Sequence, residues 1–336
     1  MPIIFTAVNI PVKARAVPAL AAVILALAAT GCGVVDRFRG ARTSFSGDSA
    51  YAYAARQVEF GPRAPGSAGA KAGGDWIIAQ MKARADSVEV QSWTHTTQTG
   101  VKLPMRNILA RFRPEQTQRV LYITHWDTRP VADNDRNLGA KQRPIIGAND
   151  GASGVGLFIA LADAFKKTPP NVGVDLLFVD GEDYGEFGDW SDSTQNKDVL
   201  IGSQYFARNM PPAYKPMFGV LFDMIGDFAL QIYQEANSIN SAPEVVTRVW
   251  EAAKDLGYQR YFLPEAGVAI TDDHLPFIRA GLHVIDVVDI NYCSDGGMNC
   301  DQDARNLHHT LGDTMEHVSA KSLQIVGDVA LTLVTK

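Results

Sequence analysis

Acidic and histidine side chains that could bind a metal ion occur in five short, scattered segments of this chain. They are His125 in THWDT, Asp150 in GANDGAS, Glu182 and Asp183 in VDGED, Asp223 in LFDMIG and His309 in LHHT. Imidazole nitrogen and carboxylate oxygen are donors that zinc accepts in sites that keep one position open for water or substrate. A carboxylate beside a ligand, such as Glu182, is placed to carry a proton. Together the segments predict a zinc site with a proton-transferring carboxylate.

Two of these segments have a simple structural alternative. Asp150 precedes an apolar helical pattern that starts near Ser153, so it is either a helix cap or a metal ligand. The glycines around it let the backbone approach a site closely, and a carboxylate can bridge two metals, which favours the ligand. Glu182 and Asp183 follow a strand that ends in Asp180, and acids so close together repel unless cations or protons compensate them. They form either a solvated acidic turn or a site where Asp183 binds zinc and Glu182 shuttles protons.

The remaining candidates depend on their neighbours. His125 ends the run LYIT, with Asp127 close enough in sequence to orient its ring. Asp223 interrupts an apolar strand, where a charge needs a metal or a protonated substrate amine as its partner. TDDHLPF opens an apparent helix, so capping accounts for one of Asp272 and Asp273 and leaves the other unexplained.

Two further segments flank these positions. His308 and His309 are consecutive on a loop, where neighbouring side chains are expected to point opposite ways, so at most one is expected to be a ligand. Trp190 precedes the polar run SDSTQNKD, which is most simply a solvated loop, although the tryptophan could line a pocket.

An alternation of β-rich runs and helical patterns predicts the elements that position these residues. RNILARF, RVLYITHW, VDLLFVD, FGVLFDMI and LHVIDVVD predict strands, while SGVGLFIALADAFKK, GSQYFARNM, SAPEVVTRVWEAAKDLG and SAKSLQIVGDVALTLV predict helices. Near-continuous apolar strands fit a mostly parallel sheet covered on both faces. The predicted fold is α/β, a three-layer α/β/α sandwich, and such sheets gather ligands at the carboxyl ends of their strands. The candidate residues that end the predicted strands lie there.

Composition predicts one globular domain. The 336 residues are 46% hydrophobic and 20% charged, and the formal net charge of −6 opposes a nucleic-acid partner, which needs a basic surface. Cys293 and Cys300 lie in the short loop CSDGGMNC. In an exported protein they are expected to form a disulfide, with two free thiols or a soft-metal site as the alternatives.

The N-terminal segment predicts export. Lys13 and Arg15 precede an apolar run that ends in AATGC, a pattern typical of a secretory signal. Cys32 resembles the lipidated cysteine of bacterial lipoproteins, with a plain cleaved signal peptide or an uncleaved anchor helix as alternatives. We therefore expect residues 1–32 to be a lipoprotein-type signal, 33–48 a tether and 49–336 the catalytic domain. The expected location is the bacterial cell envelope, with the protein lipid-anchored in the periplasm.

In order and residue type, the segments from about residue 50 to the C-terminus resemble the zinc-dependent aminopeptidase family that also contains glutaminyl cyclases. GPRAPGSAGA, HWD, GANDGASG, VDGED, FDMIG and HHT match that family's motifs in sequence order. TDDHLPF is more similar to the glutaminyl cyclase branch. The resemblance implies a zinc exopeptidase-like fold and a peptide or protein N-terminus as the substrate.

The resemblance also implies roles for individual residues. Asp150, Asp183 and His309 would hold one catalytic zinc, and Glu182 would be the general acid and base. The other implied positions are a carboxylate network of Asp223 and Asp272, and pocket residues Ile270, Trp190 and His308. The implied reaction is cyclisation of an N-terminal glutamine to pyroglutamate with release of ammonia. Two positions depart from the pattern, because Asp183 stands where the family more often has glutamate and His308 where cyclases carry tryptophan.

Two alternatives remain at this point. A two-zinc aminopeptidase would use His125 and Asp223 for a second metal, Asp150 as the bridge, and Glu182 to activate water for attack on a peptide bond. A non-enzymatic binding ectodomain would retain the fold without the metal. It would be expected to have lost ligands, whereas every ligand is present.

Overall fold

The structure is a computed structural model that describes residues 43–187, 198–297, 300 and 305–336. Residues 42–336 group into one compact unit. The predicted signal with Cys32, nearly all of the predicted tether, and Trp190 lie outside the described residues. Among the described helices, none is long and apolar enough to cross a membrane.

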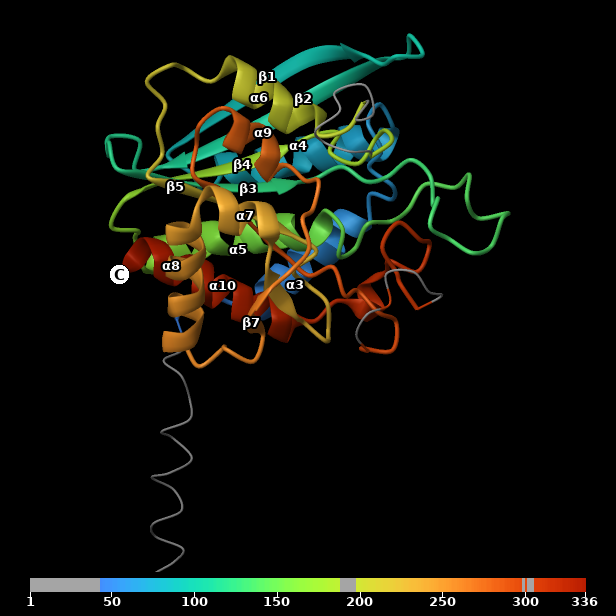
Figure 1. Cartoon of the computed structure of the whole chain (residues 1–336). Coiled ribbons are helices and arrows are strands. Elements are labelled where there is room, and N and C mark those ends of the chain that lie inside the picture. The colour runs from blue at the N-terminus through green and yellow to red at the C-terminus, as the bar shows by residue number, and fades with distance from the viewer. Residues whose placement is uncertain (1–42, 188–197, 298–299, 301–304) are drawn as a thin grey trace, which may run out of the picture. The chain divides into compact units, whose positions relative to one another are not determined.

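A six-stranded sheet forms the centre of this unit (Figure 1). Its strands in chain order are β1 (Ser87–Thr96), β2 (Lys102–Phe112), β3 (Arg119–His125), β4 (Gly173–Val179), β5 (Phe218–Asp223) and β8 (Val284–Val288). Their spatial order is β1-β2-β4-β3-β5-β8. β4, β3, β5 and β8 run parallel, whereas β2 pairs antiparallel with both β1 and β4. The prediction of a mostly parallel sheet is confirmed.

The parallel strands are buried on both faces, as their apolar runs predict. Every residue of β4 is buried, and alternate residues of the strands enter two separate hydrophobic cores. Leu176 and Phe178 pack in the larger core, while Leu177 and Val179 pack in the smaller one. A near-continuous apolar run is therefore explained by helices on both sides.

Helices form the two outer layers of the sandwich. One layer packs against the larger core and contains α3 (Gly47–Val58), α4 (Ala68–Lys82), α5 (Ala152–Lys167), α8 (Pro243–Asp255) and α10 (Ala320–Thr335). The opposite layer contains α6 (Ile201–Asn209) and α9 (His274–Arg279), which contribute Phe206 and Phe277 to the smaller core. Figure 1 shows the sheet between these layers, so the three-layer α/β/α prediction is confirmed.

Small elements complete the unit near one end of the sheet. The short helix α7 (Ala236–Ser241) contacts β8, and the strands β6 (Ile232–Gln234) and β7 (Phe262–Ala266) form a separate parallel pair. A 3-10 turn, η2 (Met315–His317), precedes α10. The segment from β6 to α9 borders the site described below.

The last residues of the predicted tether pack into this unit. Phe45 is buried against α10, and the side chain of Ser46 accepts a hydrogen bond from the Ser49 amide at the start of α3. The Phe45 ring packs directly against Gly327, where a Cβ would force it to shift. The folded unit thus begins several residues before position 49, because an aromatic anchor and a helix cap precede α3.

Candidate active site

The predicted strand-end residues come together at the carboxyl edge of three adjacent strands. His125 ends β3, Asp223 ends β5, and Glu182 and Asp183 follow β4. Since β4, β3 and β5 are neighbours and parallel, their ends meet at one edge. Asp150 reaches the same place from the loop before α5.

Three side chains converge in a first candidate metal group. Nε2 of His309 lies 2.8 Å from Oδ1 of Asp183 and 3.7 Å from Oδ2 of Asp150. Within the described part of the chain, Oδ2 of Asp150 and both carboxylate oxygens of Asp183 are buried and have no partner with hydrogen-bond geometry. Buried carboxylates left in this way need a cation. The donor set therefore fits a zinc ion.

A second candidate group shares one of these carboxylates. Nε2 of His125 lies 3.1 Å from Oδ1 of Asp150 and 3.0 Å from Oδ1 of Asp223. The ligand atoms of these three residues lie within 4.8 Å of one another. Asp150 thus stands between two groups of donors, which is the geometry of a bridging carboxylate.

Asp150 is positioned by its backbone and does not cap α5. The residue that caps this helix is Gly151, which makes no side-chain bond, so the capping alternative is wrong. The carboxylate of Asp313 accepts hydrogen bonds from the amides of Asn149 and Asp150 at 2.8 and 3.2 Å. Gly151 has φ +92°, and a Cβ there would lie 2.6 Å from the carbonyl oxygen of Asp127. Only glycine lets this loop approach β3 so closely.

The turn after β4 is buried and tightly held, so the solvated-turn alternative is wrong. The carboxylate of Asp127 accepts hydrogen bonds from the amides of Glu182 and Asp183 at 3.1 and 3.3 Å. Asp127 was expected to orient His125, and its Oδ1 lies 3.6 Å from Nδ1 of that ring. One carboxylate therefore aligns the turn beside the histidine.

The electrostatic environment shifts the pKa values of Glu182 and Asp183, the two acids of this turn, in opposite directions. Burial, followed by repulsion from Asp183, raises the pKa of Glu182 well above its usual value. Burial also opposes ionisation of Asp183, but attraction to His309 and Arg129 outweighs it and lowers the pKa of Asp183. At neutral pH the turn thus carries an ionised carboxylate next to one that readily holds a proton. That division suits a metal ligand beside a proton carrier.

His308 and His309 do not point opposite ways, contrary to the prediction. Their ring centroids are 3.7 Å apart, and Nε2 of His308 lies 3.9 Å from Oδ2 of Asp150. His309 has φ +57°, a left-handed conformation that turns the chain between the two residues. Both rings consequently face the same group of donors.

Asp272 lies buried close to the metal candidates. Burial, then repulsion from Asp223 and Asp273, raises the pKa of Asp272 well above its usual value. Asp273 precedes α9 but makes no capping bond and instead accepts a hydrogen bond from the hydroxyl of Ser203. Capping therefore does not explain Asp273, whereas Oδ1 of Asp272 accepts a hydrogen bond from the Asp273 amide just before α9.

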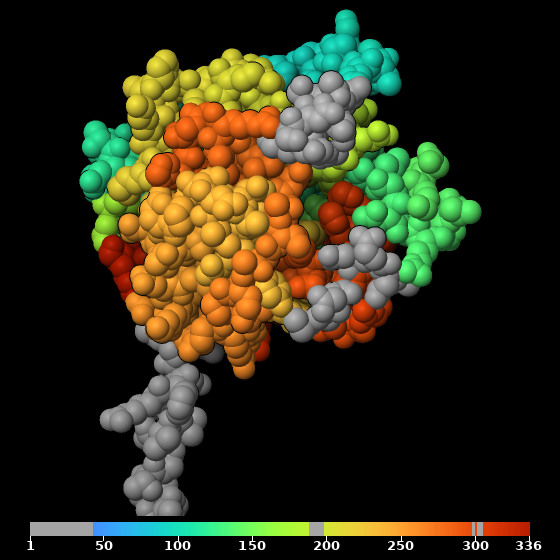
Figure 2. Space-filling model, in the orientation of Figure 1, coloured from blue at the N-terminus to red at the C-terminus, as the bar shows by residue number. Residues whose placement is uncertain are grey.

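A pocket of about 780 Å³ opens over the two metal groups. Its walls include Arg129, Phe187, Ile270, Ile290 and His308. In Figure 2 a hollow is visible between the orange surface, which contains residues 268–272, and the green surface around residues 129–134. The pocket has room for the terminal residue of a peptide.

Sequence reasoning missed several residues that hold the site together. Arg63 is fully buried and donates to the carbonyl oxygens of Trp126, Ile146 and Gly147, so it ties the loop before α4 to the end of β3 and to the loop that carries Asp150. Its segment, GPRAPGSAGA, matched the family pattern, yet a lone arginine in a glycine-rich loop does not reveal its partners. Asp313 gave no signal either, because its two amide donors lie more than 160 positions away.

Comparison with known proteins gives relatives of two kinds. The chain is 26% identical over 288 residues to glutaminyl-peptide cyclotransferase from Bos taurus, which covers 76% of each protein. It is 23% identical over 241 residues to aminopeptidase YwaD from Bacillus subtilis, and this match covers 68% of the chain but only 44% of that relative.

Solved structures of bacterial proteins are more similar. A Zn-dependent exopeptidase from Parabacteroides distasonis is 37% identical with a TM-score of 0.79, and the match covers 88% of this chain and 100% of that one. Glutaminyl cyclase from Bacteroides thetaiotaomicron, bound to N-acetylhistamine, is 36% identical with a TM-score of 0.79 and coverage of 87% and 98%. The model of peptidase family M28 matches residues 107–334, which is more than half of the chain. The chain therefore belongs to peptidase family M28.

Proposed function

We propose that this protein is a zinc-dependent glutaminyl-peptide cyclotransferase, which converts an N-terminal glutamine to pyroglutamate and releases ammonia. The proposal depends on one observation, which is the close approach of His309 to the carboxylates of Asp150 and Asp183. These carboxylates have buried oxygens without a hydrogen-bond partner among the described residues, and Glu182 is buried beside them. The similarity to bacterial glutaminyl cyclases over nearly the whole of their chains supports it.

In this proposal Asp150, Asp183 and His309 hold one zinc ion. When bound there, zinc polarises the carbonyl of the substrate's side-chain amide and makes its carbon more electrophilic. The two carboxylates and the imidazole match the donors of catalytic zinc sites, which leave a position for substrate. A zinc site is consistent with both the cyclase and the aminopeptidase relatives. The number of zinc ions bound per chain therefore distinguishes the two candidate reactions.

Glu182 transfers the proton. The substrate's α-amine attacks the amide carbon, so a bond forms between these two atoms while the bond to the amide nitrogen breaks. Glu182 accepts the proton that the α-amine loses and returns it to the departing nitrogen, which leaves as ammonia. Burial and repulsion from Asp183 raise the pKa of Glu182, which strengthens its hold on the proton that it accepts and then returns. No external water is consumed.

Asp223 and Asp272 bind and orient the amine in this proposal. Asp223 is held by Nε2 of His125 and faces the pocket, and Asp272 is buried next to it. A carboxylate in this position accepts a hydrogen bond from the substrate's amino group and directs the nitrogen toward the amide carbon. Ile270 supplies an apolar wall.

The first experiment incubates the zinc-loaded protein, from Arg42 onward, with a Gln-initiated and a Leu-initiated peptide while product mass is followed. Loss of ammonia from the Gln-initiated peptide alone is the expected result. Shortening of either peptide by one residue would instead identify an aminopeptidase. No change in the mass of either peptide would favour a different amide substrate or the non-enzymatic binding ectodomain.

The second candidate is a two-zinc aminopeptidase, which the group of His125, Asp150 and Asp223 favours. In that enzyme the second group holds another zinc and Glu182 activates water. The His125→Ala variant separates the candidates. In a two-zinc aminopeptidase it would lose one zinc equivalent together with peptide cleavage, whereas in the cyclase the single zinc equivalent is retained.

We also propose that the protein is exported and lipid-anchored through Cys32, on the basis of the N-terminal sequence. Labelling of the full chain with a radioactive fatty acid in a bacterial host tests this. The Cys32→Ser variant should remain unlabelled and leave the membrane fraction. Equal labelling of both proteins would refute the anchor.

A further inference from the structure

The consecutive histidines 308 and 309 both reach the metal group, although only one position carries a ligand in the resembled family. Nε2 of His308 lies 3.9 Å from Oδ2 of Asp150, and Nε2 of His309 lies 3.7 Å from the same oxygen. These three side chains form a candidate metal-binding group by themselves, with ligand atoms within 4.8 Å of one another. The extra donor therefore needs an explanation.

The separations suit one shared ion. Zinc lies about 2.0–2.2 Å from its nitrogen and oxygen donors, so two donors of one tetrahedral ion are roughly 3.3–3.6 Å apart. The contacts of His308 and His309 to Asp150, at 3.9 and 3.7 Å, are only a few tenths of an ångström longer, a difference that a small rotation of each ring closes. The left-handed conformation of His309 brings the two rings to the same side of the chain and so makes the arrangement possible.

The four donors differ in exposure. The side chains of Asp183, Asp150 and His309 are 1%, 3% and 8% exposed, whereas the side chain of His308 is 35% exposed and lines the pocket. Three donors are therefore enclosed, and the fourth stands where a substrate enters. Only His308 has room to turn away without disturbing the core.

We propose that His308 is an additional, displaceable zinc ligand, which completes the metal's coordination in the free enzyme and is replaced by the substrate. This rests on the proposed function for the identity of the substrate but not for the ligation itself. Catalytic zinc sites normally reserve their fourth position for water or substrate. In this chain an imidazole would occupy that position until a peptide displaces it.

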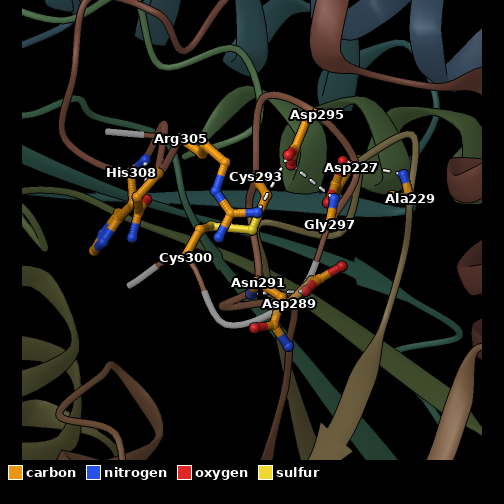
Figure 3. Close-up of a disulfide and its surroundings, with 11 residues drawn as sticks. Asp227, Ala229, Asp289, Asn291, Cys293, Asp295, Gly297, Cys300, Arg305 and His308 are labelled. Carbon is orange, nitrogen blue, oxygen red and sulfur yellow. Dashed lines mark hydrogen bonds and ion pairs between the residues drawn. A yellow bond between two sulfur atoms is a disulfide. The ribbon is translucent and has the colours of Figure 1, made fainter. Parts of the chain in front are cut away.

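The backbone around His308 is fixed, so displacement needs only a side-chain rotation. Its amide donates to Oδ1 of Asn306, and its carbonyl oxygen accepts a hydrogen bond from the side chain of Asn134. Figure 3 shows His308 near Arg305, to the left of the disulfide of Cys293 and Cys300. The ring can turn while both of these backbone hydrogen bonds are kept.

The first test measures zinc affinity by competition with a chelating indicator dye. We compare the wild type with His308→Phe, which keeps a ring and removes both donors. The matched control is His283→Phe, whose side chain is 59% exposed and pairs with Glu244 away from the pocket. We expect His308→Phe to bind zinc about tenfold more weakly or worse, a loss typical of removing a group that supports a metal site. The control should equal the wild type.

The second test uses cobalt, whose visible spectrum reports its coordination. Without peptide, cobalt-loaded wild type and His308→Phe should differ, and they should converge once a Gln-initiated peptide is added. Equal zinc affinities and equal spectra without peptide would overturn ligation. Spectra that still differ with peptide, while ammonia is released, would overturn displacement.

The outcomes also separate this inference from the proposed function. If the wild type releases no ammonia, the cyclase assignment fails, but the affinity comparison still decides whether His308 binds the metal. Should His308→Phe not fold, His308→Gln replaces it, because glutamine is flexible and polar at a partly exposed position.

Discussion

Glu182 combines burial with an adjacent negative charge, and both features favour its protonated form. The side chain is nearly enclosed at the wall of the pocket, and Asp127 binds the amides of the turn that carries it. A carboxyl group held in this way can both accept and donate a proton near neutral pH. Its Oε2 lies 4.0 Å from Nδ1 of His125, outside the group formed by Asp150, Asp183 and His309.

The Glu182→Gln variant should therefore lose the reaction and keep the metal. Glutamine has nearly the same shape but cannot take up a proton, so ammonia release from a Gln-initiated peptide should fall by about 10²–10⁴-fold. Zinc content, measured by atomic absorption, should equal that of the wild type. Glu251→Gln, on the exposed face of α8, is the control and should keep full activity. Activity within a few-fold of wild type would remove Glu182 from its assigned role.

Most of the candidate residues could be predicted because of where they stand in the sequence. Charged side chains that end apolar strands, such as His125 and Asp223, must meet at one edge of a parallel sheet. The direction of a side chain in a loop could not be predicted in the same way. His308 faces the site where the backbone of His309 is left-handed, and that conformation is uncommon in residues other than glycine, so a sequence pattern does not reveal it.

At the level of elements, the wall of the pocket depends on the junction between β6 and α7. Oε1 of Glu235 accepts a hydrogen bond from the amide of Ile270, and the side chain of Asn237 donates to the carbonyl oxygen of the same residue. The amide of Ala236 donates to the carbonyl oxygen of Val268. The loop before α9 is thus held on both sides of Ile270 by one short segment.

The Asn237→Ala variant should weaken substrate binding more than chemistry. It removes one neutral hydrogen bond, worth about 0.5–1.5 kcal/mol, and frees the carbonyl side of Ile270. We expect KM for a Gln-initiated peptide to rise roughly two- to tenfold, with a smaller change in kcat. The control is Asn240→Ala, an exposed residue of the same helix.

Hydrogen exchange followed by mass spectrometry checks the cause of this effect. Peptides that cover residues 266–273 should exchange faster in Asn237→Ala than in the wild type or in Asn240→Ala, since the loop has lost a contact. An unchanged exchange rate together with an unchanged KM would show that this contact does not hold the pocket wall.

The elements themselves were predictable to different degrees. The strands β3, β4, β5 and β8 are long apolar runs, and sequence shows them clearly because both faces are buried. β1 was missed, since its residues alternate between exposed and half-buried and it pairs only with β2 at the sheet edge. The prediction of a mostly parallel sheet did not say which strand is antiparallel, and the structure shows that it is β2 that pairs antiparallel with β4.

For the whole molecule, the metal should contribute to stability. The buried carboxylates of Asp150 and Asp183 lie close enough to repel each other, and a cation would compensate them. A ligand that binds only the folded state at 100 times its Kd adds about 2.7 kcal/mol to the free energy of unfolding. Zinc should therefore raise the Tm of the chelator-treated protein by several degrees.

Thermal unfolding followed by circular dichroism, with and without zinc, measures this effect. Asp183→Asn removes one charged donor, so its Tm should respond far less to zinc. A wild-type Tm that is the same in chelator and in excess zinc would contradict tight binding at this site.

A buried acid that has no role in the proposed reaction should make the stability of the whole fold depend on pH. Asp227 is buried, its Oδ1 accepts a hydrogen bond from the amide of Ala229, and its Oδ2 has no partner among the described residues (Figure 3). Burial raises the pKa of Asp227 to about 6. The folded protein therefore binds this proton more tightly than the unfolded chain does, for which the pKa is about 3.9.

The sign of the effect follows from this difference. The stabilising contribution is fully present below about pH 4 and is lost as pH rises through about 6, because the folded state must then bury a charge. The Asp227→Asn variant keeps an oxygen for the Ala229 amide and never ionises. Above pH 6 it should be more stable than the wild type by roughly 2–3 kcal/mol, at about 1.4 kcal/mol per pKa unit.

Urea denaturation at several pH values between 4 and 8 checks this prediction through the difference between variant and wild type. That difference should grow from near zero at pH 4 and level off above pH 6, which separates Asp227 from carboxylates that titrate in both proteins. Asp255→Asn, an exposed control at the end of α8, should show no change between pH 5 and 7. A constant difference across the whole range would mean that the substitution acts through packing, and that Asp227 is not protonated in the folded state.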